Sequence, residues 1–358
     1  MKDIEKWTGE IHVGDASETL AKMPESSVHC CVTSPPYFGL RNYQKDDQIG
    51  LEETLDRYIE SLVNVFDELK RVLRPDGSLW LNLGDTFAGS GRGQWDNDEG
   101  RPKESYRPDE GSLPDREENL PQKSKMLIPH RVAISLQASG WIVRSDAVWT
   151  KVNGMPHPVK DRLNESKEFF FHLVQKPSYW FDLDAIREDY AESSIQRVNQ
   201  NNGNPNWEGD AERGHPDGEE TLNPNQFTHS KGKNPGDIFE VTTAQFPQAH
   251  FAVMPLELAR KPIRATCPKK TCGGCGRGLE WSEEKAEWMK DCGCNSEETD
   301  AGIALDPFAG TGTVCVEAKD QGKKFVGIDL NEEYAKMAEN RLRQTSGIHG
   351  QKTQKQLF

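Results

Sequence analysis

The sequence has no long hydrophobic run and is poor in apolar residues overall. Hydrophobic side chains make up 34% of the 358 residues. No apolar stretch approaches the ~20 residues that a membrane-spanning helix needs. The N-terminus, MKDIEKWTGE, also lacks the apolar core of a signal peptide. These absences exclude a membrane protein and predict a soluble protein of the cytoplasm.

Positive charge is also scarce. Lysine and arginine number 44 against 58 acidic residues, which gives a net charge of -14. Because contacts to phosphate require a basic surface, two interpretations stay open. One is a protein from a high-salt organism that keeps a local basic cleft, and the other is an acidic enzyme that never touches nucleic acid. The eight cysteines of an intracellular chain indicate metal ligands or core residues and not a disulfide framework.

The stretch AGIALDPFAGTGT, residues 301–313, is the most informative of the chain. An apolar run typical of a buried parallel strand ends at Asp306, and a turn with two glycines then leads into a helical segment. Doubly wound folds hold nucleotide-like cofactors on such a turn, beside the helix N-terminus. A second apolar strand, 323–329, ends at Asp329, about 20 residues beyond the glycines, where a carboxylate meets ribose hydroxyls. The sequence therefore predicts a cofactor with a ribose.

The loop TSPPY, residues 33–37, follows another apolar strand, 28–32. Two consecutive prolines have no N–H group and hold the backbone extended, so the carbonyls of the loop stay free to accept hydrogen bonds. A plain turn after a strand is the alternative for a Pro-Pro pair considered alone. The loop is predicted to be a rigid acceptor site.

These two loops together resemble a known family. DPFAGTGT is similar to motif I and TSPPY to motif IV of the amino-methylating DNA methyltransferases, which bind S-adenosyl-L-methionine (SAM). LNLGDTF, GWIVRSDAVWTKVNGMP and HFAVMPLELA resemble motifs VI, VIII and X. Motif IV precedes motif I, which is the order of the circularly permuted β-class of N4-cytosine and N6-adenine enzymes. The resemblance implies an α/β fold, a permuted Rossmann-like SAM-dependent methyltransferase sheet with polar insertions, in which the strand before Asp15 neighbours the strand ending at Asp329.

The resemblance also divides the chain into domains. Residues 1–185 would form the catalytic half, with motifs III–VIII and a mobile insertion at 87–125. Residues 186–236 are almost free of apolar side chains, so they are either a target-recognition insertion or plain disorder. Residues 237–358 would form the SAM-binding half, with motifs X, I and II and a zinc knuckle at 267–294.

Roles for single residues follow from the same resemblance. The side-chain oxygen of Ser34 and the backbone carbonyl of Pro35 would accept the two amino hydrogens of the target base. Tyr37 would stack on that base after it is flipped out of the duplex. Asp15 would lie near the adenine of SAM, or would simply cap a helix. The implied catalytic residues are Ser34, Pro35, Pro36 and Tyr37. The implied SAM-binding residues are Asp15, Thr33, His250, Phe251, Asp306, Pro307, Phe308, Ala309, Gly310, Thr311, Gly312, Thr313 and Asp329.

The target base is predicted from Ser34. Within the family, Ser-Pro-Pro-Tyr accompanies mostly N4-cytosine methylation, and a neutral hydroxyl can accept from the amino group while donating to cytosine N3. N6-adenine stays open as the alternative. A narrower resemblance is to the CTAG-modifying N4-cytosine methylases of halophiles. The expected partner is double-stranded DNA, and the protein is expected to be a monomer or homodimer; whether a cognate restriction endonuclease accompanies it stays open.

Five cysteines precede motif I in the pattern Cys267-x4-Cys272-x2-Cys275, then Cys292-x-Cys294. Paired thiolates at this spacing are typical of a four-sulfur zinc site, and we expect the last four to be the ligands, with Cys267 as the spare. An all-sulfur tetrahedral site leaves no open position for substrate, so the zinc would be structural.

Two other classes of protein are disfavoured. A dinucleotide-dependent oxidoreductase would share the glycine turn and Asp329, but it has no use for TSPPY. A DNA-binding module with an inactive methylase fold would not need an intact Asp306, Ser34 and Tyr37.

Overall fold

The computed structural model describes residues 3–39, 48–89, 120–154, 159–193, 195–196, 229–244 and 253–345. The chain divides into a large unit, residues 1–181 with 237–358, and a small unit, residues 182–236. Where the small unit is described, it holds a short 3-10 helix, η1 (Asp184–Ile186), and an isolated antiparallel bridge between Glu188 and Lys233. Within the described parts of the chain, no helix is long and apolar enough to cross a membrane.

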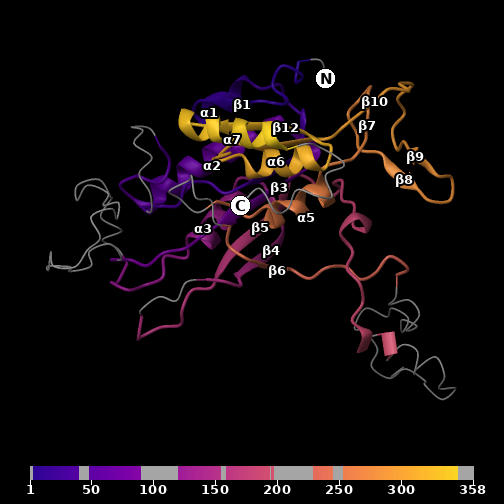
Figure 1. Cartoon of the computed structure of the whole chain (residues 1–358). Helices are drawn as coiled ribbons and strands as arrows, with labels where there is room; N and C mark the ends of the chain where they lie inside the picture. The colour runs from indigo at the N-terminus through magenta and orange to yellow at the C-terminus, as the bar shows by residue number, and fades with distance from the viewer. Residues whose placement is uncertain are drawn as a thin grey trace. The chain divides into compact units, whose positions relative to one another are not determined.

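The large unit is built on an eight-stranded sheet with the order β1-β12-β11-β2-β3-β5-β4-β6 (Figure 1). The five strands from β1 to β3 run parallel, β5 is antiparallel to both its neighbours, and β6 is parallel to β4. The strands are β1 (Ile11–Val13), β2 (Val28–Thr33), β3 (Leu73–Leu83), β4 (Ile142–Lys151), β5 (Lys167–Val174), β6 (Ile238–Val241), β11 (Ile303–Asp306) and β12 (Lys324–Asp329). The predicted α/β fold with a mostly parallel sheet is confirmed.

The first strand of the chain lies beside the last one. β1 pairs in parallel with β12, with Val13 opposite Asp329, and the Gly14 N–H donates to the Asp329 carbonyl at 3.0 Å. β11 joins this pair to β2, with Leu305 opposite Cys31. The sequence-based expectation that the strand before Asp15 neighbours the one ending at Asp329 is therefore confirmed.

Helices cover both faces of the sheet, and each face has its own hydrophobic core. α1, α2 and α3 pack on one face, whereas α5, α6 and α7 lie across the other, where Figure 1 shows them in orange and yellow. The helices are α1 (Ala16–Lys22), α2 (Leu55–Val72), α3 (Ile128–Ala138), α5 (Leu256–Thr266), α6 (Thr313–Asp320) and α7 (Glu332–Gln344). Because parallel strands are buried on both sides, this layering matches their continuous apolar sequences.

α2 shows how the sequence sets an element. Its apolar residues recur with the helical period and are buried, except for the partly buried Val63, and Thr54 caps its start by accepting from the Arg57 N–H. β3 begins at Leu73, directly after α2, and Leu73 pairs with Val28 of β2. The predicted mobile insertion 87–125 falls largely outside the described residues, and its ends meet in an antiparallel bridge between Phe87 and Lys125.

A small cysteine-bearing lobe stands between α5 and β11. β7 (Thr271–Cys272) pairs with β10 (Thr299–Asp300), and β8 (Glu280–Ser282) forms a hairpin with β9 (Glu287–Met289). Two side chains tie the lobe to the sheet. Arg74 Nη1 donates to the Cys275 carbonyl at 2.9 Å, and His29 Nε2 lies 2.8 Å from the Gly276 carbonyl.

His29 is held neutral by its surroundings. Its Nδ1 accepts from the Ile303 N–H at 3.0 Å, so its proton must lie on Nε2, which donates to Gly276. Burial, and next the charge of Arg74, lower the pKa of His29 to about 4. The imidazole therefore links β2, β11 and the cysteine lobe in a geometry that protonation would break.

We expect acid to weaken the fold through His29. Below pH 6.5 the unfolded chain binds a proton that folded His29 does not accept until about pH 4, so the free energy of unfolding falls with decreasing pH across this window. The full contribution is about 3 kcal/mol. Denaturant unfolding from pH 7 to 4 should show a smaller pH dependence in His29→Gln than in the wild type, while exposed His229→Gln changes nothing. An identical pH dependence in His29→Gln would contradict this assignment.

Candidate active site

A cavity of about 340 Å³ lies where β2, β3, β11 and β12 end. The Pro-Pro loop and the glycine turn both line it, so Tyr37 and Phe308 face the same space although they are far apart in the sequence. Its other walls come from α1, β3, β4 and β5, with the turn after β12. A cavity at the carboxyl edge of an open α/β sheet is the usual ligand site of such folds.

Thr33, the last residue of β2, joins the two loops. Its Oγ1 donates to Asp306 Oδ1 at 2.7 Å, and the Phe308 N–H donates to the same oxygen at 3.0 Å. Asp306 ends β11 and is only 4% exposed. Burial raises the pKa of Asp306 to about 7, although both hydrogen bonds act in the opposite direction. The carboxyl group thus titrates near neutral pH, and it holds both loops at one edge of the sheet.

The glycine turn is folded around a second carboxylate, Asp329. Gly310 and Gly312 have φ values of +53° and +77°, which side chains rarely adopt. The Gly310 N–H donates to Asp329 Oδ2 at 2.7 Å, and the Asn331 N–H donates to Oδ1 at 2.8 Å. Burial raises the pKa of Asp329, and these two bonds oppose that rise. Each carboxylate oxygen keeps a second acceptor position for a ligand hydroxyl.

A buried arginine supports this turn from behind. Arg341 of α7 donates through Nη1 to the Thr311 carbonyl at 2.7 Å and to its hydroxyl at 2.8 Å. The same nitrogen lies 3.2 Å from Thr313 Oγ1. A Cβ on Gly312 would stand 2.7 Å from the Cβ of Ala338, so α7 packs directly on the turn. Arg341 could not be predicted from the sequence, because a single arginine in an amphipathic helix gives no signal.

The Pro-Pro loop is fixed by tyrosines. Tyr58 of α2 donates to the Pro36 carbonyl at 2.8 Å. Among the residues that the structure describes, none donates to the Pro35 carbonyl, so that carbonyl is the available acceptor. The ring of Tyr37 lies on Gly84 at the end of β3, where a Cβ would stand 2.6 Å from the ring. Gly84 therefore makes the space that Tyr37 fills.

A chain of polar contacts runs from Tyr37 along the cavity wall. Its hydroxyl lies 2.7 Å from Glu168 Oε2, 3.2 Å from Asn82 Oδ1 and 3.3 Å from Ser34 Oγ. Lys151 Nζ lies 2.6 Å from the other oxygen of Glu168. Burial, and next the charge of Glu168, raise the pKa of Tyr37 well above its usual value. Its phenol therefore stays protonated at physiological pH.

Most of the residues named from the sequence line this cavity. They are Asp15, Ser34, Pro35, Pro36, Tyr37, Asp306, Pro307, Phe308, Ala309, Gly310, Thr311, Thr313 and Asp329. Thr33 and Gly312 lie behind the wall and hold it in place. Asp15 also caps α1 by accepting from the Glu18 N–H at 2.9 Å, which confirms the capping alternative. His250 and Phe251 lie outside the described residues.

The cavity is also lined by residues that were not predicted from the sequence, among them Asn82, Trp149, Lys151 and Glu168. Lys151 is the last residue of β4 and Glu168 is the second residue of β5, and these antiparallel strands pair with Trp149 opposite Glu168. Charged residues at a loop–strand junction look like solvent-exposed ends in the sequence. Only the pairing of the strands reveals that they face the cavity.

Four of the five cysteines before motif I come together. The sulfur atoms of Cys272, Cys275, Cys292 and Cys294 all lie within 4.8 Å of one another. Tetrahedral zinc with ~2.3 Å bonds places its sulfurs about 3.8 Å apart, so small inward shifts would complete such a site. Cys267 is buried apart from them at the end of α5, and burial raises the pKa of its thiol to about 12.

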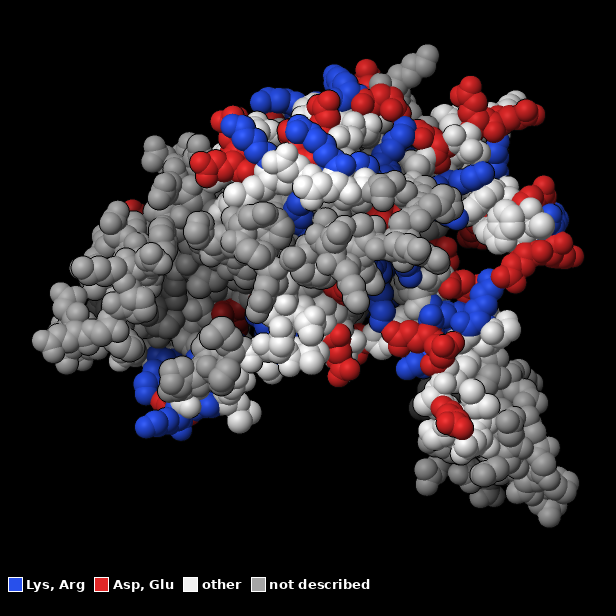
Figure 2. All heavy atoms as spheres, viewed as in Figure 1, with Lys and Arg blue, Asp and Glu red and all other residues white. Residues whose placement is uncertain are grey.

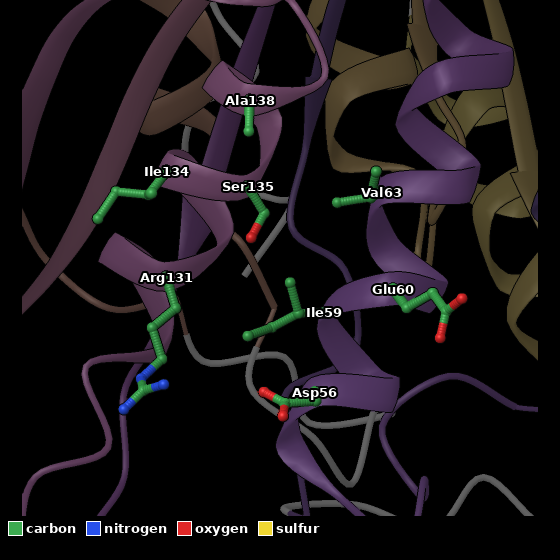
Figure 3. A pocket seen from close by; sticks show the side chains of 8 residues that line it. All are labelled: Asp56, Ile59, Glu60, Val63, Arg131, Ile134, Ser135 and Ala138. Carbon is green, nitrogen blue, oxygen red and sulfur yellow. The ribbon is translucent and has the colours of Figure 1, made fainter.

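A second hollow lies between α2 and α3 (Figure 3). Ile59 and Val63 of α2 and Ser135 and Ala138 of α3 line it, and Arg131 lies at one end. Its lining residues belong to these two helices and include no residue of the Pro-Pro loop or the glycine turn. It has no part in the site described above.

Thr33→Val tests the bond that joins the loops, because valine keeps the shape of threonine and removes its O–H donor. The buried Asp306 then loses one donor, so we expect the free energy of unfolding to fall by about 1–3 kcal/mol. Denaturant unfolding measures the change. Thr243→Val, which removes an exposed hydroxyl 3.1 Å from Asn153 Oδ1, should cost less than ~0.5 kcal/mol. Equal losses in both variants would contradict the role of Thr33.

Comparison with known proteins gives a consistent result. A DNA methylase family model matches residues 28–340. The chain is 35% identical over 329 residues to the type II methyltransferase M.Cfr9I of Citrobacter freundii, covering 92% of this chain and 86% of that protein. It is 32% identical over 336 residues to M.SmaI of Serratia marcescens, covering 93% and 90%.

Solved structures share the fold. The chain superposes on the PvuII DNA methyltransferase, described as cytosine-N4-specific, with a TM-score of 0.54 and 15% identity over 93% of this chain and 86% of that one. A protein of Thermus thermophilus in complex with S-adenosyl-L-methionine gives a TM-score of 0.50 with 20% identity, covering 95% of each chain. At these identities the likeness concerns the fold alone.

Proposed function

The chain belongs to the DNA methylase family of the N6/N4 type, and from that premise we propose that it transfers a methyl group from SAM to the N4 amino group of a cytosine in double-stranded DNA. One observation carries this proposal. The acceptor loop 34–37 and the glycine turn 307–313 line the same cavity, so an amine held by the first would meet a ligand held by the second. Methylation at the same site on adenine N6 is the second candidate.

The glycine end of the cavity fits SAM. When bound, SAM supplies an activated methyl group on a sulfonium. Asp329 has acceptor positions left for the ribose hydroxyls, and Asp15 would lie near the adenine. Asp306 would face the methionine portion, whose ammonium group would favour the ionised carboxylate. An oxidoreductase cofactor would share Asp329, but it would leave the acceptor loop 34–37 without a role.

The other end of the cavity is suited to an exocyclic amine. The lone pair of such an amine is delocalised into the ring, so the enzyme must hold its two hydrogens and align the nitrogen. Ser34 Oγ and the Pro35 carbonyl are the acceptors, because the Pro36 carbonyl is already bonded to Tyr58. Alignment of this kind lowers barriers by up to ~7–11 kcal/mol, so no covalent intermediate is needed.

The choice of cytosine rests on the Ser-Pro-Pro-Tyr motif. The Ser34 hydroxyl donates its only proton to the Tyr37 oxygen at 3.3 Å. In this arrangement it does not donate to cytosine N3, as the sequence suggests it could. Both bases present an amino group beside a ring nitrogen, so the cavity suits either in this respect. The narrower resemblance to CTAG-modifying methylases stays a prediction.

Duplex DNA is the proposed partner despite the net charge of -14. Two segments that carry cations are tied together by ion pairs, since Lys123 Nζ lies 2.6 Å from Asp161 Oδ2 and Lys125 Nζ lies 2.6 Å from Glu165 Oε1. Figure 2 shows Lys and Arg side chains gathered at the lower left of this face. Such clusters provide the local phosphate contacts that the whole chain's charge does not.

The remaining assignments are proposals of the same kind. The target base is flipped out of the duplex to reach the cavity. Residues 186–236 serve target recognition, between a catalytic half, 1–185, and a SAM-binding half, 237–358. The type II relatives support a cognate restriction endonuclease as a partner in the cell.

The decisive assay uses tritium-labelled SAM and unmethylated duplex DNA, followed by nucleoside analysis. We expect label in N4-methylcytosine, and label in N6-methyladenine would select the second candidate. Ser34→Ala removes an amine acceptor, so transfer should fall by at least about a hundredfold while SAM affinity stays within a fewfold. Ser135→Ala, in the hollow between α2 and α3, should behave as the wild type. An active Ser34→Ala enzyme would refute the acceptor role.

We also propose that Cys272, Cys275, Cys292 and Cys294 hold a structural zinc ion. The donor set fits, because four sulfurs already converge and fill a tetrahedral shell. Elemental analysis should find one zinc per chain. Cys292→Ser should lose it, and Cys267→Ala should keep it, because that sulfur lies outside the cluster. A folded wild-type protein without metal, or a Cys267→Ala variant without zinc, would contradict this site.

A further inference from the structure

We propose that Lys151 and Glu168 are positioning residues, which act through Tyr37 to fix Ser34 as a pure hydrogen-bond acceptor. The inference rests on the proposed function and deepens it. It states how an ordinary hydroxyl, which can donate or accept, is made to present only its lone pairs to the target amine.

The four groups form one line of contacts along the cavity wall. Lys151 Nζ lies 2.6 Å from Glu168 Oε1, and the Tyr37 hydroxyl lies 2.7 Å from Glu168 Oε2. Ser34 Oγ follows, 3.3 Å from the Tyr37 oxygen. The side chain of Glu168 is only 11% exposed, and that of Lys151 is 26% exposed. All four residues line the cavity.

The directions of these bonds follow from counting protons. A carboxylate paired with an ammonium group has no hydrogen, so Glu168 can only accept, and Tyr37 must donate to it. Tyr37 has one proton, so its oxygen can take part in the contact with Ser34 only as the acceptor. Ser34 then gives its own single proton to Tyr37. What remains on Ser34 Oγ is lone pairs, which is what an amine with two hydrogens and a delocalised lone pair requires.

A second acceptor near the Tyr37 hydroxyl does not change these hydrogen-bond directions. Asn82 Oδ1 lies 3.2 Å from the Tyr37 hydroxyl, but it is farther away than Glu168 and carries no charge. Asn82 itself is held by its Nδ2 donating to the Phe169 carbonyl at 3.2 Å, so its oxygen stays an acceptor. Both neighbours therefore draw the Tyr37 proton away from Ser34.

The placement of Glu168 and Lys151 argues against a purely structural ion pair. Burying two opposite charges costs more free energy of desolvation than their attraction provides, unless the charged groups also make further hydrogen bonds. Here the second carboxylate oxygen is used by Tyr37, and Gly84 leaves room for the Tyr37 ring by lacking a Cβ. The ion pair is thus connected to the acceptor loop 34–37 through a single side chain, that of Tyr37.

The test compares kcat, KM and SAM affinity in Glu168→Gln, Tyr37→Phe and the double variant. Glutamine keeps the size of Glu168, but its amide can donate to Tyr37, which frees the tyrosine proton to turn towards Ser34. Phenylalanine keeps the ring and removes the hydroxyl. We expect kcat to fall by at least about tenfold in either single variant, with KM for DNA and the Kd for SAM within about threefold.

The double variant tests whether Glu168 acts through Tyr37, which we call the relay, or whether the two substitutions disturb the packing independently. If Glu168 acts only through the Tyr37 hydroxyl, the double variant should be no slower than Tyr37→Phe alone. Losses that multiply in the double variant, or wild-type kcat in either single variant, would overturn the relay. Glu240→Gln, an exposed carboxylate on the neighbouring strand β6, is the matched control and should keep wild-type kcat.

These experiments distinguish an error in the relay from an error in the proposed methyltransferase function. An active wild-type enzyme with an unaffected Glu168→Gln variant overturns the relay and leaves the function standing. A folded wild-type protein that binds SAM and transfers no methyl group overturns both. Should Glu168→Gln fail to bind SAM because it does not fold, Tyr37→Phe decides the question from the other end, since it leaves the Lys151–Glu168 pair intact.

Discussion

The hydrogen bond from Thr33 to Asp306 is the contact on which the site depends. It links the end of β2 to the end of β11, two adjacent parallel strands whose loops come from opposite ends of the chain. Parallel pairing brings both strand ends to one edge, and the short bond between two buried side chains then fixes the distance between the loops. This bond and the sheet register together place the acceptor loop and the glycine turn at one cavity.

Much of this architecture could be predicted from the sequence, because it is written in local patterns. Apolar runs ending in Asp306 and Asp329, and the two loops that follow strands, each identify an element and its polarity. The rule that parallel strands end at a common edge does the rest. The cysteine spacing likewise indicated which four sulfurs come together, because knuckle geometry is set by nearest neighbours along the chain.

The parts that could not be predicted are those that depend on pairing between distant strands. Glu168 and Lys151 look like surface charges until the antiparallel register of β4 and β5 turns them into the cavity, and Arg341 resembles any exposed arginine of an amphipathic helix. The same limit applies to Ser34. The sequence shows a hydroxyl, but its hydrogen-bond direction is decided by Tyr37 and by what Tyr37 touches.

The claim that both loops face one cavity, with the methyl group of SAM between them, can be measured directly by photo-crosslinking. Ultraviolet irradiation of the protein with methyl-labelled SAM attaches the label to side chains in contact with it, and peptide mapping identifies them. The account predicts label on the peptide with Tyr37 and on the peptide with Phe308, both suppressed by excess unlabelled SAM. Saturable label confined to peptides that do not line this cavity, such as those of the hollow between α2 and α3, would contradict it.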